Sequence, residues 1–81
     1  MQPVPIVKIN ALAISMAGRN TNPQRRRSLY GMLNSSSAAA KLAAVGHVLP
    51  QLQVTINSSG DLFAVIEDDE LREKAIALAA Q

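Results

Sequence analysis

The chain has 81 residues, enough for one domain with a thin hydrophobic core. It has no cysteine, which excludes disulfides, a thiolate metal site and a cysteine nucleophile. Its formal net charge is +2, but six basic residues and no acid precede Asp61, whereas six acids and only two basic residues lie from Asp61 onward. This asymmetry predicts a surface that binds a polyanion or an acidic protein surface, with intramolecular neutralisation as the alternative.

The apolar residues are mainly Ala, Leu, Val and Ile, and the only aromatic residues are Tyr30 and Phe63. Small side chains bury little area each, so we expect modest stability as a monomer, which a homo-oligomer would increase. The longest uncharged stretch, residues 42–60, is interrupted by Gly46 and Pro50, which argues against a membrane span. We therefore expect a soluble, cytoplasmic protein without a membrane partner.

The N-terminal segment is predicted to begin as an extended arm over residues 1–4, because Pro3 and Pro5 disfavour helical backbone in the residues before them. Apolar residues then recur at helical spacing: Ile6, Ile9, Leu12, Ala13 and Met16. This spacing predicts one helix from Pro5 to a left-handed cap at Gly18. A strand over residues 4–9, followed by a shorter helix, is the alternative.

The middle of the chain, residues 23–50, is predicted to form two helices separated by a polar turn. Asn22 followed by Pro23 is typical of a helix start. Gly31 within this helix costs about 1 kcal/mol relative to Ala, which suggests close packing there. The polar run 34–37 ends the helix, and the next helix has a predicted buried stripe: Ala38, Leu42, Val45 and Leu49.

The C-terminal third is predicted to be a β-hairpin followed by a helix. Apolar and polar residues alternate over 51–56, and residues 57–61 supply a turn. Residues 62–66 return as a strand that is apolar on both faces, so we expect a helix to cover it. Asp68 or Asp69 caps the last helix. Residues 1–81 therefore read as a single small α+β domain with three helices, a hairpin and a C-terminal helix.

Two helices joined by a short polar turn and followed by a hairpin have the order of a winged helix-turn-helix domain. In that arrangement the outward side of the third helix faces the DNA bases, and the hairpin flanks it. The residues expected on that side are Ser37, Lys41, Ala44 and His47. The resemblance is one of architecture and not of motif, so it is an analogy.

Arg25, Arg26 and Arg27 lie in the opening turn of the second helix, where cations oppose the positive end of the helix dipole. Guanidinium groups and free backbone N–H groups at a helix start both bind phosphate, which would explain the cations there. Arg19 and Lys41 could extend this basic patch. The alternatives are pairing with the acids of residues 67–70, or an acidic surface on a partner protein.

Catalysis is not expected, because the only histidine, His47, has no nucleophile and acid around it in the sequence. The acids of residues 67–73 lack the spacing of a calcium loop, so we expect neither metal nor cofactor. The leading hypothesis is a nucleic-acid-binding regulator that uses Arg19, Arg25, Arg26, Arg27 and Lys41. The alternative is a protein-interaction module, such as an inhibitor or assembly factor of the type that phages and mobile elements encode, which an exposed apolar face would favour.

Overall fold

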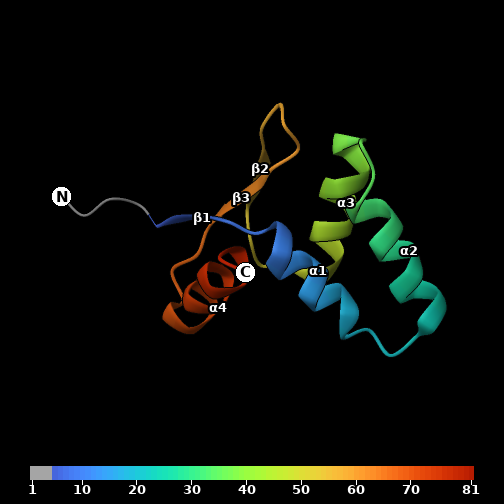
Figure 1. Cartoon of the computed structure of the whole chain (residues 1–81), viewed down its shortest axis with the longest axis horizontal. Coiled ribbons are helices and arrows are strands. Elements are labelled where there is room, and N and C mark those ends of the chain that lie inside the picture. Colours follow the sequence, from blue (N-terminus) through green and yellow to red (C-terminus); the bar gives the residue numbers. More distant parts are fainter. Residues whose placement is uncertain (1–4) are drawn as a thin grey trace.

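The computed structural model describes residues 5–81, which form four helices and a three-stranded antiparallel sheet (Figure 1). In chain order the elements are β1 (Ile6–Lys8), α1 (Asn10–Gly18), α2 (Pro23–Leu33), α3 (Ala38–Val48), β2 (Val54–Ile56), β3 (Leu62–Val65) and α4 (Asp69–Ala79). This confirms the predicted small α+β domain. The arm predicted over residues 1–4 lies outside the described residues. Within residues 5–81, no helix has the length and hydropathy needed to cross a membrane.

The sheet has the strand order β1-β3-β2, so the predicted hairpin is present and β1 joins its far side. The hairpin turn is held by Asn57, whose side-chain oxygen accepts hydrogen bonds from the backbone N–H groups of Ser59 and Asp61. Gly60 follows with a φ of 83°, which a residue without a Cβ adopts readily. The polar turn run was therefore read correctly from the sequence.

The predicted single helix from Pro5 to Gly18 is wrong, and the alternative of a strand followed by a shorter helix is confirmed. Strand β1 pairs with β3, with Ile6 opposite Val65 and Lys8 opposite Phe63. This backbone pairing over a long sequence separation outweighs the helical spacing of the apolar residues. Ile6, counted on the buried face of that helix, is 62% exposed. Gly18 is also not a left-handed cap, since Gly60 is the only described glycine with a positive φ.

The junction between β1 and α1 attaches the helices to the hairpin. The Ile9 N–H donates to the Leu62 carbonyl at 2.8 Å, one residue past the β1–β3 ladder. The Asn10 side chain then accepts a hydrogen bond from the Leu62 N–H at 2.8 Å and donates one to the Gly60 carbonyl at 3.3 Å. Ile9 and Leu62 are both buried beside these bonds, so polar and apolar contacts fix the same point.

The core lies around α1, which contacts α2, α3 and α4 and buries Leu12, Ala13 and Ala17 completely. Only the second half of α3 and the residue after it reach this core, through Ala44, Val45 and Leu49. The predicted stripe of α3 is therefore right at Val45 and Leu49. It is wrong at its start, because Ala38 and Leu42 are exposed.

The sheet buries one face only. Leu62, Ala64 and Ile66 point into the core and are nearly inaccessible to solvent. On the other face, Val65 is 40% exposed beside its cross-strand neighbour Ile6. The strand predicted over residues 62–66 is therefore present, and its inner face lies in the core while its outer face is partly exposed.

The helical glycines divide into two groups. A Cβ at Gly31 or Gly46 would meet no atom within 4 Å, so the close packing predicted at Gly31 is absent. A Cβ at Gly18 would lie 2.5 Å from the Tyr30 hydroxyl oxygen, so an alanine methyl group fits there only if the Tyr30 side chain shifts. Glycine at this position lets the end of α1 approach the aromatic ring on α2.

Gly31→Ala and Gly46→Ala should each raise the free energy of unfolding by about 0.5–1 kcal/mol, because alanine restricts the unfolded chain and nothing obstructs its methyl group. Gly18→Ala should lower it by about 1 kcal/mol or more, since Tyr30 must move. Adding Tyr30→Phe should recover part of that loss. Urea unfolding measures all four chains, and a stabilising Gly18→Ala would contradict the packing described here.

Asn10→Ala should lower the free energy of unfolding by about 2 kcal/mol, because it leaves the Leu62 N–H and the Gly60 carbonyl without their side-chain partner. The matched control is Asn34→Ala, since the exposed Asn34 side chain makes no hydrogen bond within residues 5–81. That change should stay within about 0.5 kcal/mol. Equal effects in thermal or urea unfolding would show that the junction is not special.

Candidate functional site

The start of α2 is capped from within the chain. The Asn22 side chain accepts hydrogen bonds from the Gln24 and Arg25 N–H groups, at 3.0 and 3.3 Å. The Asn22 N–H itself donates to the Asn20 side chain at 2.9 Å, and Pro23 has no N–H to offer. The backbone donors that we expected to hold phosphate are therefore already satisfied, and only side chains remain for an anion.

The three arginines of this turn have different surroundings. Arg26 is half-buried and donates to the Asn20 carbonyl at 2.7 Å, so it braces the connector between α1 and α2. Arg25 and Arg27 are exposed. Two residues along a helix correspond to a rotation of about 200°, so these two side chains leave α2 on nearly opposite sides. The arginine run therefore surrounds the helix start and does not form a flat patch.

A groove of about 510 Å³ lies between α2 and α3 on the side of Arg25. Its lining includes Asn22, Arg25, Ser28 and Met32 of the α2 segment and His47 near the end of α3. Arg25, Ser28 and His47 can all donate hydrogen bonds, so the groove suits an anionic group. The sequence placed His47 on a DNA-reading face but did not associate it with Arg25. The short turn between two consecutive helices, which brings the end of α3 back beside the start of α2, was the available signal.

Arg19 and Lys41, the two proposed extensions of the basic patch, lie differently. Arg19 ends α1 as an exposed residue, and its guanidinium group makes only a weak contact of 4.0 Å with the Met16 sulfur. Lys41 donates to the Leu33 carbonyl at 2.7 Å, at the C-terminal end of α2. Because eight residues of helix rise about 12 Å, this ammonium group is well separated from the start of α2. Lys41 neutralises the negative end of the helix dipole there.

The described part of the chain contains two ion pairs, Lys8 with Asp61 at 3.3 Å and Arg72 with Asp69. Neither involves Arg19 or the three arginines of α2. The predicted alternative, in which residues 67–70 neutralise these arginines within the fold, is therefore not what the structure shows. The exposed guanidinium groups of the α2 start are free to bind another molecule.

The expected DNA-reading face of the third helix is not formed as predicted. Ala44 is completely buried in the core. The Ser37 hydroxyl caps α3 by accepting from the Ala40 N–H at 3.2 Å, and Lys41 is engaged with Leu33. Of the four residues, only His47 is exposed without such an engagement. The reason is that the Ala44 side of α3 lies in the core, which α3 shares with α1, α2 and β2.

Among residues 5–81, no three His, Asp or Glu side chains gather closely enough to hold a metal ion. Comparison of the chain with protein-family models, with curated proteins and with solved structures finds no match.

Lys41→Met should lower the free energy of unfolding by about 1–2 kcal/mol, because it removes a charged donor from the Leu33 carbonyl. Lys74→Met is the matched control, since Lys74 is exposed on α4 and changes the net charge equally. Its effect should stay within about 0.5 kcal/mol. If both lysines prove equivalent in urea unfolding, Lys41 is not the brace that its position indicates.

Proposed function

We propose that this chain is a cytoplasmic, non-enzymatic regulator that binds the phosphate backbone of nucleic acid through the exposed arginines around the start of α2. The observation that carries this proposal is the state of Arg25 and Arg27, which are exposed and have no carboxylate partner in the described chain. Cations at a helix start oppose the dipole by about 0.3 kcal/mol or more each. A bound phosphate removes that penalty, because an anion at this end interacts favourably with both the dipole and the guanidinium groups.

The contact set is Arg19, Arg25 and Arg27, with Ser28 and His47 supporting Arg25 in the α2–α3 groove. Guanidinium groups bind phosphate through two parallel hydrogen bonds, so each arginine can hold one phosphate firmly. Arg25 and Arg27 leave the helix on opposite sides. A nucleic-acid strand that contacts both would therefore have to pass across the N-terminal end of α2. Contacts to phosphate carry no sequence information. We therefore propose binding to the sugar-phosphate backbone of the nucleic acid and not to its bases.

Within the small α+β class, we propose that the chain has a winged helix-turn-helix arrangement. It is supported by the order of α2, polar turn, α3 and the β2–β3 hairpin, and by the pairing of β1 with β3. Base readout by α3 is not part of the proposal, because Ala44 is buried. The arginines at the start of α2 then supply the affinity.

The salt dependence of binding tests this function. With three phosphates neutralised, the slope of log K against log[salt] on duplex DNA should be about −2.7, which weakens binding about 40-fold between ~50 and ~200 mM salt. In the Arg25→Gln, Arg27→Gln variant the slope should fall to about −0.9. Fluorescence anisotropy with labelled DNA and RNA measures both.

The matched control is Lys8→Gln with Lys74→Gln, which lowers the net charge equally but lies outside the contact set. This control should keep the wild-type slope. Equal losses in the two double variants would mean that net charge alone drives binding. A slope near zero in the wild type would remove the proposal, provided circular dichroism shows the chain folded.

A second candidate, a protein-interaction module, is favoured by the outer face of the sheet. Ile6 and Val65 lie side by side there, 62% and 40% exposed, with Phe63 half-exposed on the same face. Exposed neighbouring apolar residues often mark a protein contact. Association with a partner protein that survives high salt, and that Ile6→Thr with Val65→Thr abolishes, would favour this function over nucleic-acid binding.

A further inference from the structure

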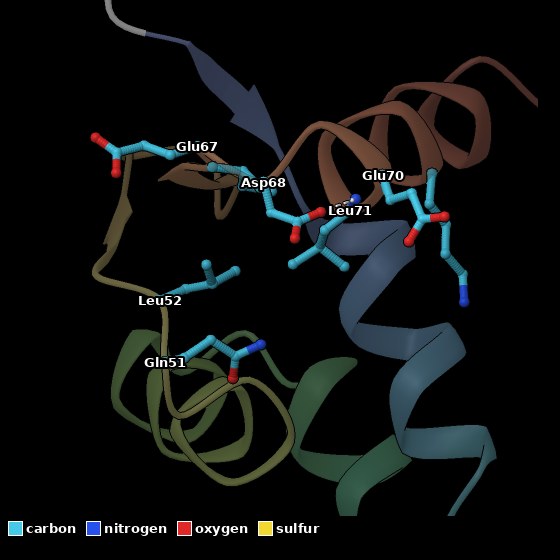
Figure 2. Close-up of a pocket in the computed structure, with 8 residues that line it drawn as sticks. Gln51, Leu52, Glu67, Asp68, Glu70 and Leu71 are labelled. Carbon is cyan, nitrogen blue, oxygen red and sulfur yellow. Dashed lines mark hydrogen bonds between the residues drawn. The ribbon is translucent and has the colours of Figure 1, made fainter.

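A second groove lies between the segment before β2 and the first turn of α4 (Figure 2). Its volume is about 620 Å³, which is larger than that of the α2–α3 groove. Leu52, Ile66 and Leu71 supply apolar surface, and Figure 2 shows the Leu52 and Leu71 side chains pointing toward one another across it. Glu67, Asp68 and Glu70 also line the groove. The Asp68 carboxylate accepts a hydrogen bond from the Leu71 N–H at 2.9 Å, and Figure 2 shows the Glu67 carboxylate at the outer edge, pointing away from the two leucines. We call this set of residues the α4 groove.

The carboxylates of the α4 groove are largely unneutralised. Glu67 and Glu70 are exposed and belong to neither ion pair of the described chain. The nearby Arg72 does not serve them, because it pairs with Asp69 and donates to the Ile66 carbonyl at 2.9 Å. Lys74 is the one cation in the lining. The groove is therefore acidic and apolar at once.

This combination fits an arginine side chain. Its three methylenes can lie against the leucines while its guanidinium group forms two parallel hydrogen bonds to a carboxylate. A phosphate or another anion is repelled by the three acids. The occupant that the chemistry selects is therefore a protein segment that presents exposed arginines.

Such a segment is present in the chain itself. Arg25 and Arg27 are exposed and unpaired at the start of α2. Figure 1 shows α2 and α4 on opposite sides of α1, so one molecule cannot bring its own arginines to its own groove. In a head-to-tail contact between two molecules they do meet.

We propose that the α4 groove receives the arginine-bearing start of α2 from a second copy of the chain. The contact is heterologous, so every assembly keeps one free arginine end and one free groove at its two ends, and association continues into short open chains. Exposed ion pairs are weak and screened, so these chains form at high protein concentration and low salt. The proposal uses the same arginines as nucleic-acid binding but does not depend on that function.

Sedimentation velocity over a concentration series gives the first test. At ~10 mM salt, where the Debye length is about 30 Å, the wild type should form species larger than a monomer, and these should dissociate near ~150 mM salt, where it is about 8 Å. Glu70→Arg should raise the apparent dissociation constant at least about tenfold, because it opposes the incoming arginines. Glu73→Arg is the matched control, since Glu73 is exposed on α4 but does not line the groove. Its association should stay near the wild-type level.

Mixing two charge-reversed variants, one changed in the α4 groove and one at the start of α2, gives the second test. Glu67→Arg with Glu70→Arg makes both ends basic, and Arg25→Glu with Arg27→Glu makes both ends acidic, so each variant alone should sediment as a monomer. Their equimolar mixture should associate, because each arginine end now finds an acidic groove. If either reversed chain fails to fold, the corresponding Gln variants should still lose self-association.

Three results would overturn the second copy as occupant. The first is a wild type that stays monomeric at low salt, even if the groove binds a free arginine-rich peptide. The second is self-association that Glu70→Arg leaves intact. The third is a mixture of folded reversed variants that does not associate. Failure here leaves the salt-dependent binding of DNA unaffected, so the two proposals are tested separately.

Discussion

The structure depends on the point where β1 becomes α1. There the backbone of Ile9 and the side chain of Asn10 hydrogen-bond to Gly60 and Leu62, at least fifty residues away in the sequence. These bonds close the sheet against the first helix and place buried Ile9 beside Leu62. Because α1 contacts the three other helices, fixing its start positions the arginine end on one side and the α4 groove on the other. The separation of charge in space follows from this junction and from the order of charges along the chain.

Local chemistry made part of this fold predictable. Asn22 and Asp68 cap their helices as expected, and the 34–37 and 57–61 turns lie where their polar residues indicated. The errors came from long-range contacts. The pairing of β1 with β3 converts the expected first helix into a strand and a shorter helix, and no short-range pattern reports that partner. In α3, periodicity gave the helix but misplaced its buried side, because the packing of Ala44 against the core decides the rotation.

In the candidate site, too, the local features could be predicted from the sequence and the long-range contacts could not. The sequence identified the arginine run and its conflict with the helix dipole, but it could not show how each side chain is engaged. Arg26 and Lys41 brace backbone carbonyls, whereas Arg25 and Arg27 stay exposed. Those engagements depend on where Asn20 and Leu33 place their carbonyls, which is a property of the folded chain. The apolar part of the α4 groove was also invisible to sequence reasoning, since it joins Leu52 to Leu71 across two elements.

We propose that the exposed arginines around the start of α2 receive the phosphates of a nucleic acid. Amide chemical shifts of the isotope-labelled chain, followed by NMR during titration with a short duplex at low salt, test it most directly. We expect shift changes that disappear as salt is added and that are concentrated at five residues: Arg19, Arg25, Arg27, Ser28 and His47. Changes concentrated on the outer sheet face or in the α4 groove, or no change at any residue, would contradict it.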